Sequence, residues 1–248
     1  MQTAIIPPID LLTEKLVESQ EMYMFLPHLL DREEYRAHIT RCEGYRILDN
    51  GAAEGTTYEF DALNSIAATF YIDEVVIPDV IGDCDLTIEL ARWAGSAAKP
   101  QGVKWMAVVQ GQKISEVLKC WREMLRLEWV DVIGVPRHLN KYHPTARFAL
   151  IQSLRQMSTP DEDFFAKPVH ALGSHSWVSE VAALARLGCV RSIDTSLPLH
   201  MAQLGESLRT AQEGQKRPAD YFEHRWTQEE VVMARDNIRV FQHWATAP

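Results

Sequence analysis

Two stretches of the chain, Ile47-Leu48-Asp49-Asn50-Gly51 and Ser192-Ile193-Asp194-Thr195-Ser196, share one pattern. Each is a short apolar run that ends in an aspartate, and small or turn-forming residues follow each aspartate. In a parallel barrel the C-terminal ends of all strands meet at one face, so two such strands bring both carboxylates to the same place. Two carboxylates in different surroundings can divide the roles of nucleophile and general acid/base.

Similar apolar runs occur along most of the chain and alternate with amphipathic stretches. The predicted strands cover residues 4–7, 22–26, 46–49, 74–78, 104–110, 130–135, 169–173 and 190–194. The predicted helices cover residues 31–42, 58–70, 86–98, 114–127, 144–156, 177–187, 201–212 and 227–244. Runs rich in Val and Ile are typical of parallel strands that helices cover on both faces. The alternation predicts an α/β fold, a single-domain (β/α)8 TIM barrel over residues 1–248.

A doubly wound sheet is the main alternative to this barrel. It usually begins with a glycine-rich turn, and no G-x-G-x-x-G occurs in the chain. Local signals mark several helix ends. Asp31 with Glu34, and Thr227 with Glu230, predict capping boxes, and Gly188 predicts the end of a helix.

The overall composition is that of an ordinary globular protein, with 46% hydrophobic and 24% charged residues. The formal net charge of −9 argues against a surface that is basic throughout, but it allows a local basic patch. Four cysteines without a C-x-x-C pair predict reduced thiols in a cytoplasmic protein. No apolar run approaches the length of a membrane span, and the first ten residues lack a basic region, so we expect neither a membrane segment nor a signal peptide.

Polar and small residues follow the predicted strands, at the face where such barrels carry their active sites. From the third strand onward they are Asp49-Asn50-Gly51, Asp79, Gln110-Gly111, Gly134-Val135, Leu172-Gly173 and Asp194-Thr195-Ser196. Carboxylates with a carboxamide suit a flat, hydrogen-bonding heterocycle better than a phosphate, since no glycine-rich phosphate loop is present. Taken singly, Asp49 fits a turn and Asp194 fits a helix N-cap. Their joint occurrence at strand ends favours a site.

We expect no metal and no organic cofactor. His28, His175 and His200 do not have H-x-x-x-H or H-E-x-x-H spacing, which predicts ordinary surface or loop histidines. No cysteine follows Cys189, so a Cys/His zinc cluster after the last strand is not expected.

The order of these segments resembles that of the tRNA-guanine transglycosylase family, whose members exchange guanine for a 7-deazaguanine base. The family's D-S-G-G-F-Q, the next strand-end aspartate and V-Q-G-G are similar to residues 49–54, Asp79 and residues 109–112. Its G-L-A-V-G, L-M-G-V-G and D-x-F-D-C-V-x-P-T are similar to residues 133–136, 171–175 and 191–198. The matches are colinear between residues 45 and 200.

Some features depart from the family pattern. The aromatic residue that stacks on the base falls at Ala53, and Glu54 stands where glutamine is usual. The family's C-x-C-x-x-C…H zinc site has no counterpart, and the chain is short. This form resembles the phage and bacterial relatives that insert 7-deazaguanines into DNA. The implied partners are therefore DNA, favoured over tRNA, and a free 7-deazaguanine base such as preQ0.

The resemblance implies a role for each matched residue. Asp194 would attack C1′ of the target nucleotide to form a covalent aspartyl-nucleotide intermediate. Asp49 would protonate the leaving base and deprotonate the incoming one. The nucleotide would be flipped into the pocket. The implied base-binding residues are Asp79, Gln110, Gly111, Gly134, Val135, Leu172 and Gly173.

A basic segment begins just past the sixth predicted strand. Residues 132–160 contain no acidic side chain, and we expect Arg137 and Lys141 to bind nucleic-acid phosphates. The other basic residues of this segment fit a solvated loop and helix face. The polar stretch 212–220 predicts a surface loop. The oligomeric state stays open between a monomer and a homodimer.

Other functions are compatible with the sequence. The substrate of a transglycosylase could be tRNA instead of DNA. Another barrel enzyme with paired carboxylates, such as a glycoside hydrolase, would need several aromatic residues in its cleft, and Trp and Tyr are scarce at the strand ends. A non-catalytic partner subunit would be expected to lose a catalytic aspartate, whereas both are present here.

Overall fold

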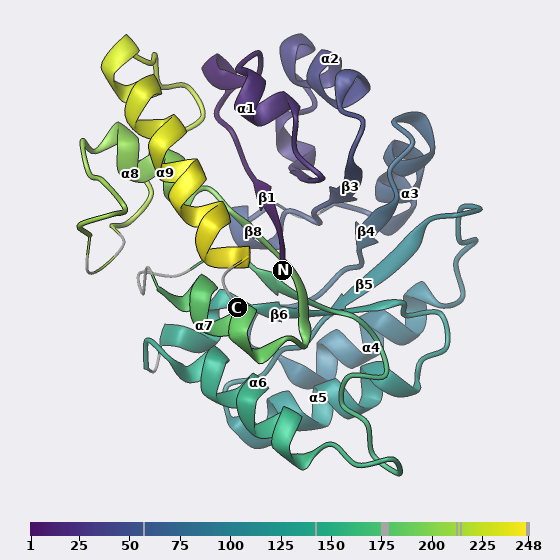
Figure 1. The fold of residues 1–248 in the computed structure, drawn as a ribbon. Coiled ribbons are helices and arrows are strands. Elements are labelled where there is room, and N and C mark those ends of the chain that lie inside the picture. The colour runs from purple at the N-terminus through teal and green to yellow at the C-terminus, as the bar shows by residue number, and fades with distance from the viewer. Residues whose placement is uncertain (57, 142, 175–178, 212, 214, 247–248) are drawn as a thin grey trace.

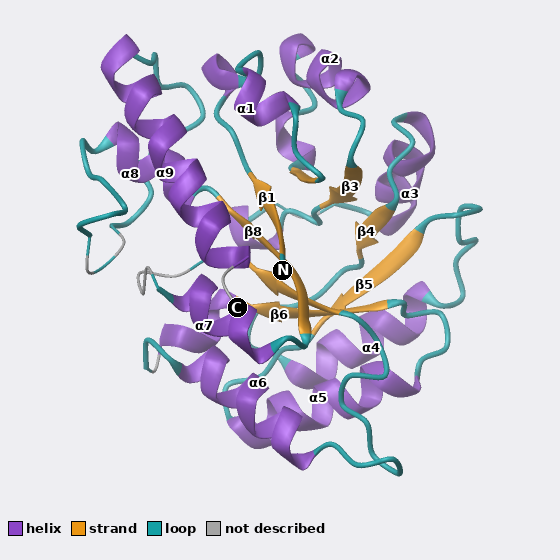
Figure 2. Cartoon of the chain, in the orientation of Figure 1, coloured by secondary structure: helices purple, strands orange, loops and turns teal. Residues whose placement is uncertain are grey.

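The computed structural model describes residues 1–248 apart from 57, 142, 175–178, 212, 214 and 247–248. Its centre is a sheet of eight parallel strands that curves into a barrel (Figures 1 and 2). The strands are β1 (Gln2–Ile5), β2 (Met22–Phe25), β3 (Tyr45–Leu48), β4 (Glu74–Val76), β5 (Lys104–Val108), β6 (Val132–Pro136), β7 (Val169–Leu172) and β8 (Val190–Thr195). The single-domain (β/α)8 TIM barrel is confirmed, and each predicted strand lies within two residues of an observed one.

The strands pair by backbone hydrogen bonds in the order β1-β8-β7-β6-β5-β4-β3-β2. The first and last strands in this order, β1 and β2, do not pair by such bonds, and we call the gap between them the seam of the barrel. The buried side chain of Gln20 bridges it. Its Oε1 accepts the Ile5 N–H at 2.6 Å, and its Nε2 donates to the Ile5 carbonyl at 3.1 Å. A side-chain amide thus satisfies backbone groups that would otherwise be buried without partners.

Helices surround the barrel and cover the outer faces of its strands (Figure 2). They are α1 (Lys15–Glu18), α2 (Glu33–Arg41), α3 (Phe60–Thr69), α4 (Cys84–Ala94), α5 (Ile114–Arg126), α6 (Ala146–Met157), α7 (Glu180–Leu187), α8 (Leu197–Gln203) and α9 (Gln228–Thr246). Short 3-10 turns are η1 (Ile9–Leu11), η2 (Pro27–Leu29), η3 (Ala52–Glu54) and η4 (Arg137–Lys141). No helix among the described residues has both the length and the apolar character needed to cross a bilayer.

Two details of the helix prediction were wrong. The helix predicted at residues 201–212 is α8, which ends at Gln203, because the chain turns at Gly205 with a φ of +74°. The capping box predicted at Asp31 does not form, since α2 begins after Arg32 and no side chain caps it. The one-turn helix α1 was not predicted, and four residues are too few to show a helical period.

The other two helix-end predictions are confirmed. At the start of α9, the Thr227 N–H donates to Glu230 Oε2 at 2.7 Å, and the Glu230 N–H donates to Thr227 Oγ1 at 3.3 Å. Gly188 ends α7 with a φ of +67°. Helix α9 packs against β1, and the Met1 amino group donates to the Ala245 carbonyl at 3.1 Å. The two ends of the chain therefore lie side by side (Figure 1).

An ion pair fills the N-terminal end of the barrel. The register between β7 and β8 shifts beside Arg191, and irregularities of this kind re-aim a side chain. Arg191 donates to both carboxylate oxygens of Glu74 at 2.9 Å, and the Tyr45 hydroxyl donates to Glu74 at 2.7 Å. Glu74 is fully buried, so these donors are needed to stabilise its charge.

Candidate active site

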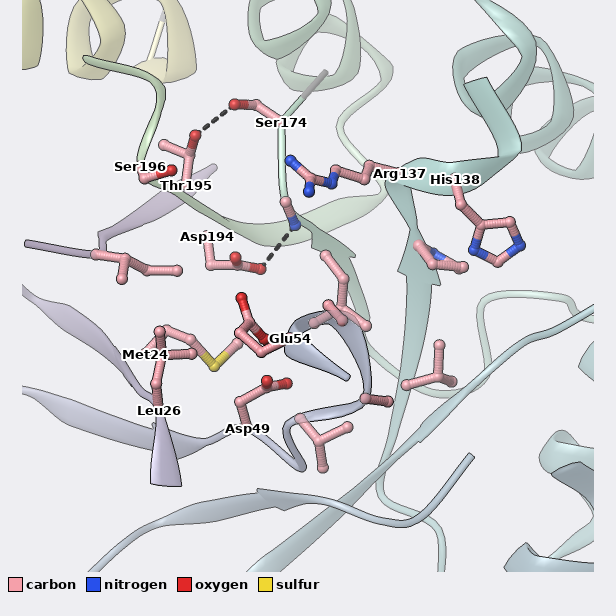
Figure 3. A pocket seen from close by; sticks show the side chains of 18 of the residues that line it. Met24, Leu26, Asp49, Glu54, Arg137, His138, Ser174, Asp194, Thr195 and Ser196 are labelled. Carbon is pink, nitrogen blue, oxygen red and sulfur yellow. Dashed lines mark hydrogen bonds between the residues drawn. The ribbon is translucent and has the colours of Figure 1, made fainter. Parts of the chain in front are cut away.

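A cavity of about 240 Å³ lies at the C-terminal ends of the strands, where barrels of this class carry their active sites. Side chains from β2 to β8 and from the loops that follow them line it (Figure 3). Apolar residues of the barrel interior, including Met24, Leu26 and Val108, form part of the wall. Asp49 and Asp194 both line this one cavity, as the barrel register predicts.

Asp194 is hydrogen-bonded on one of its two oxygens. It lies in β8 and is 6% exposed. Its Oδ1 accepts the Gly173 N–H at 2.9 Å and faces His170 Nε2 at 3.0 Å. Among the described residues, none hydrogen-bonds to Oδ2. The carboxylate is therefore fixed in orientation while one oxygen stays available.

A line of buried hydrogen bonds runs from Asp194 toward the N-terminal end of the barrel. His170 Nδ1 lies 2.7 Å from Ser192 Oγ, which accepts a hydrogen bond from Arg191 Nε at 3.1 Å. Because Ser192 accepts from Arg191, its own proton is available to His170 Nδ1. In the neutral form of His170 the proton then resides on Nε2 and faces Asp194. The hydrogen-bond network thus assigns the Nε2–H tautomer.

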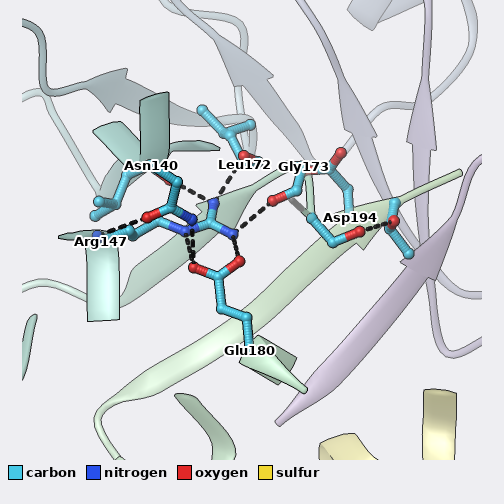
Figure 4. Close-up of polar contacts among 9 residues, drawn as sticks. Asn140, Arg147, Leu172, Gly173, Glu180 and Asp194 are labelled. Atoms are coloured by element: carbon cyan, nitrogen blue, oxygen red, sulfur yellow. Dashed lines mark hydrogen bonds and ion pairs between the residues drawn. The ribbon is translucent and has the colours of Figure 1, made fainter. Parts of the chain in front are cut away.

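Arg147 supports the same carboxylate through a peptide unit (Figure 4). Its Nη1 donates to the Leu172 carbonyl at 2.9 Å, and the N–H of that peptide, which belongs to Gly173, donates to Asp194. Its Nη2 donates to the Gly173 carbonyl at 2.7 Å. Hydrogen bonds in a chain polarise one another, so the charge of Arg147 strengthens the donor that faces Asp194.

Arg147 is itself fully buried and paired with Glu180 of α7. Its Nη2 and Nε donate to the two Glu180 oxygens at 2.7 and 3.0 Å. Asn140 joins the group, because its Nδ2 donates to Glu180 at 2.8 Å and its Oδ1 accepts the Arg147 N–H at 2.8 Å. The expectation of a solvated helix face was therefore wrong for Arg147, which anchors the ends of β6 and β7 beneath the cavity.

Asp49 reaches the cavity with fewer hydrogen bonds. Its Oδ2 accepts the Gly51 N–H at 3.1 Å. Burial raises the pKa of Asp49 to about 7, and the negative charges of Glu54 and Asp194 add to this effect. The carboxyl group therefore exchanges its proton near neutral pH, as a general acid/base must.

Glu54 is a third carboxylate in the cavity, and its side chain lies between Asp49 and Asp194 (Figure 3). It is carried by η3, a turn that Gly51 opens with a φ of +81°. Its Oε1 accepts from Arg217 at 3.3 Å, whereas its Oε2 is buried without a hydrogen-bond partner among the described residues. An unpartnered buried oxygen is a vacant acceptor for a ligand donor.

The wall of the cavity across from Asp194 carries a group of polar side chains around Asp79, which follows β4. Asn50 donates to Asp79 Oδ1 at 2.6 Å, and Gln110 donates to Asp79 Oδ2. The side-chain oxygen of Gln110, Oε1, accepts the Gly82 N–H at 3.0 Å. These bonds fix the orientation of both side chains, and burial raises the pKa of Asp79. Because β4 and β8 are four strands apart, this polar edge faces Asp194 across the barrel.

The structure brings most of the predicted site residues together. Those that line the cavity are Asp49, Asp79, Gln110, Arg137, Leu172, Gly173 and Asp194. The others do not line it: Gly111 packs against α5, Gly134 and Val135 lie within β6, and Lys141 is exposed at the end of η4. At Gly111 a Cβ would lie 2.8 Å from the Val117 backbone nitrogen. A glycine is therefore needed here so that the chain can pack closely against α5.

Three histidines were predicted to lie on the surface or in loops. His200 instead lies in α8 and is 5% exposed at the cavity wall, where its Nε2 is 2.9 Å from the Gln215 carbonyl. Burial lowers its pKa to about 4, so the imidazole is neutral. His28 is partly buried in η2, and His175 lies outside the described residues.

Sequence reasoning missed several residues of the site. They are His170, Ser192, Arg147, Glu180, Arg217 and His200. For two of them a signal was present, because residues two apart in a strand share a face. His170 precedes Leu172 by two, and Ser192 precedes Asp194 by two. Arg217 had no such signal, since it lies in the polar stretch 212–220 that was expected to be a surface loop, yet it lines the cavity.

No family model matches this chain, and no curated protein matches it either. Within the described residues, no group of three or more His, Cys, Asp or Glu side chains is placed to hold a metal ion. The chemistry that the cavity can support therefore follows from its own side chains. These provide a fixed carboxylate at Asp194, a carboxyl group at Asp49 with a pKa of about 7, and a polar edge around Asp79 that faces Asp194.

Proposed function

We propose that this protein is a base-exchanging transglycosylase, which replaces guanine in DNA with a 7-deazaguanine base. One observation carries the proposal. Asp194 and Asp49 line a single cavity in different surroundings, because hydrogen bonds fix Asp194 and leave it one free oxygen, whereas burial raises the pKa of Asp49 to about 7. A nucleophile and a general acid/base need such a division.

In the first step, Asp194 Oδ2 attacks C1′ of the target nucleotide. The glycosidic bond to guanine breaks through an oxocarbenium-like transition state, and the ester between Asp194 and the sugar forms. The proton of Asp49 passes to the leaving base, so that guanine departs as a neutral molecule. Asp49 is then an anion.

The second step repeats the first in reverse with a new base. The incoming 7-deazaguanine gives a proton to Asp49 while its ring nitrogen attacks C1′. The ester bond breaks and Asp194 is released as the free carboxylate. Two displacements on one carbon retain its configuration, as in retaining glycosidases.

The base would bind to the cavity wall across from Asp194, which carries Asp79 and Gln110. Asp79 and Gln110 are held by their own hydrogen bonds, and each Asp79 oxygen retains a second acceptor position for a ring N–H. Leu172 would cover one face of the base. The cavity lies at the end of the barrel interior, so a nucleotide must be flipped out of a duplex to enter it.

DNA is favoured over tRNA on sequence grounds, since the matched segments resemble those of the zinc-less relatives that modify DNA. Arg137 and Lys141 of η4 would contact phosphates near the cavity mouth. A cytoplasmic location and a homodimer would be compatible with this activity.

A glycoside hydrolase is the second candidate, because it too needs paired carboxylates. One observation weighs against it. None of the described residues that line the cavity is a Trp, Tyr or Phe, whereas sugar rings are commonly held by stacking on such side chains.

The test is incubation of the purified chain with radiolabelled guanine and either duplex DNA or tRNA. We expect label in DNA, and none with the Asp194→Asn variant. Label in tRNA alone would identify the polymer as tRNA. Absence of label in both polymers, together with release of sugar from an aryl glycoside, would replace the proposal with the hydrolase.

A further inference from the structure

Two arginines line the cavity, and the reaction described above gives a role only to Arg137, as a contact to phosphates near the cavity mouth. Arg137 lies at the start of η4, and Arg217 comes from the segment after α8. Figure 3 shows the Arg137 guanidinium pointing into the space beside Ser174, Thr195 and Asp194. The cavity therefore has a cationic wall next to its nucleophile.

The Arg137 guanidinium makes no hydrogen bond or ion pair with any described residue, although Asp194 and Glu54 line the same cavity. Asp194 is instead satisfied by the Gly173 N–H and by His170. Desolvation by the surrounding protein lowers the pKa of Arg137, and the positive charge of Arg217 lowers it further. An arginine with five N–H donors in such a position is available to an external acceptor.

Gly173 makes the position of Arg137 possible. Its φ is +66°, and a Cβ there would lie 2.9 Å from Arg137 Cδ. The N–H of the same glycine donates to Asp194 Oδ1. One residue without a side chain thus lets the Arg137 guanidinium extend into the cavity that the Asp194 carboxylate lines.

Arg217 is fixed from one side. Its guanidinium lies 4.9 Å from the ring centre of Phe222 and 5.7 Å from that of Tyr221. It donates one hydrogen bond, at 3.3 Å, to Glu54. Stacking on aromatic faces leaves the edge of the guanidinium uncovered, and the donors that do not bond to Glu54 can bind a phosphate.

We propose that Arg137 and Arg217 form a subsite for one phosphate group of a nucleotide whose sugar lies at Asp194. The phosphates of a nucleotide are attached to the sugar that Asp194 attacks, so cations beside Asp194 are within reach of them. A phosphate also offsets the mutual repulsion of the two guanidinium groups. This subsite rests on the proposed function and restricts its substrates to phosphorylated sugars. The cavity then selects nucleotides over free nucleosides and neutral glycosides.

The first experiment measures binding without chemistry. Calorimetry of the full chain compares deoxyguanosine, its 5′- and 3′-monophosphates and inorganic phosphate. We expect one monophosphate to bind about tenfold tighter than the nucleoside or more. This advantage should vanish in Arg137→Gln and Arg217→Gln but persist in Arg155→Gln, which changes an exposed arginine of α6. Equal affinities, an advantage unchanged in both variants, or inorganic phosphate that binds as tightly as the monophosphate would overturn the subsite.

The second experiment separates this subsite from the proposed function. Base exchange is followed on duplexes that carry a neutral methylphosphonate next to the target guanosine, or three nucleotides away as a control. We expect the adjacent substitution to lower kcat/KM about tenfold in the wild type, and to have no further effect in the Arg137→Gln/Arg217→Gln variant. Exchange that ignores both changes would overturn the subsite and leave the function intact. Arginine-dependent binding of monophosphates without exchange on any polymer would leave the subsite and overturn the function.

Discussion

Asp194 and Asp49 reach one cavity from two sides of the barrel, and their surroundings differ in kind. The region around Asp194 is dense in donors, with the Gly173 N–H and His170 on one oxygen and Arg147 behind the peptide. The region around Asp49 offers its side chain one backbone N–H, from Gly51, and two neighbouring carboxylates. Both side chains are mostly removed from water, so the donors make the difference.

This contrast shows how one fold can give two aspartates different chemistry. Hydrogen bonds to a carboxylate favour its charged form, whereas burial beside like charges favours the neutral form. The Asp194 region therefore holds its carboxyl group in one orientation, and the Asp49 region raises the pKa of its carboxyl group to about 7. The predictions below test the two regions separately.

The largest effect should follow from Asp194→Asn. The amide keeps the shape of the side chain and can still accept the Gly173 N–H, but it cannot act as the nucleophile. We expect base exchange to fall by about 10⁴-fold or more. Wild-type protein should give a covalent adduct with DNA on a denaturing gel, and the variant should give none. Near wild-type exchange with an unchanged melting curve would refute the role of Asp194.

Asp49→Asn should slow exchange by about 10²- to 10⁴-fold, since it removes the proton donor. In the wild type, exchange should decline as the pH rises through about 7, the pKa of Asp49. The variant should lose this alkaline limb. A limb that persists in Asp49→Asn would show that another group supplies the proton.

The same substitution has a consequence for stability whose sign is fixed by linkage. The pKa of Asp49 is raised on folding, so its contribution to stability is fully present below pH 3.8 and is lost as the pH rises through about 7. Asparagine does not ionise. We therefore expect Asp49→Asn to melt at least about 2 °C above the wild type at pH 8, and this advantage to shrink at pH 5. Calorimetric melting curves at the two pH values measure it.

A smaller loss of activity should follow when the support behind Asp194 is removed. Arg147→Met alone leaves Glu180 buried without its partner, which costs about 3–5 kcal/mol of stability. The paired variant Arg147→Met/Glu180→Met avoids that penalty. We expect it to fold, and to lose about tenfold to a hundredfold in kcat because the Gly173 N–H is no longer held in place. KM for the free base should change little, since Asp79 and Gln110 are untouched. A loss confined to KM would contradict a positioning role.

The smallest effect should follow from Glu54→Gln. Removal of this negative charge lowers the pKa of Asp49, so the alkaline limb of the exchange profile should move to lower pH. The matched control is Arg217→Gln, which breaks the same ion pair but leaves the charge of Glu54 in place. An equal downward movement in both variants would show that loss of the pair, and not loss of the charge, is responsible.

The sequence was sufficient for the barrel because each strand is a local apolar run, and the runs recur with helices between them. It also located Asp49, Asp79, Gln110 and Asp194, since strand ends can be found by counting. It did not reveal that Arg147 is buried, because a basic residue on an amphipathic helix has the same pattern whether its partner is water or Glu180. That distinction depends on α6 and α7 meeting in space, which no local pattern records.

The same limit applies to Arg217. It is separated from Glu54 by 163 residues and lies in a polar stretch with no periodicity. The pKa of Asp49 is likewise a property of the assembled cavity, since Asp49-Asn50-Gly51 alone has the composition of a turn. Sequence reasoning thus found the reacting groups better than the groups that tune them.

The seam between β1 and β2 also constrains the order in which the chain can fold. The described partner of β1 in the backbone ladder is β8, so residues 2–5 find their hydrogen-bonded neighbour only after residues 190–195 have been made. During synthesis the first strand must wait for the last to complete its backbone ladder, although the Gln20 side chain can hydrogen-bond to Ile5 earlier. Pairing between segments so distant in sequence slows folding. Docking of β1 and closure of the barrel are then late events, and Gln20 protects the strand edge on which a second nascent chain would otherwise pair.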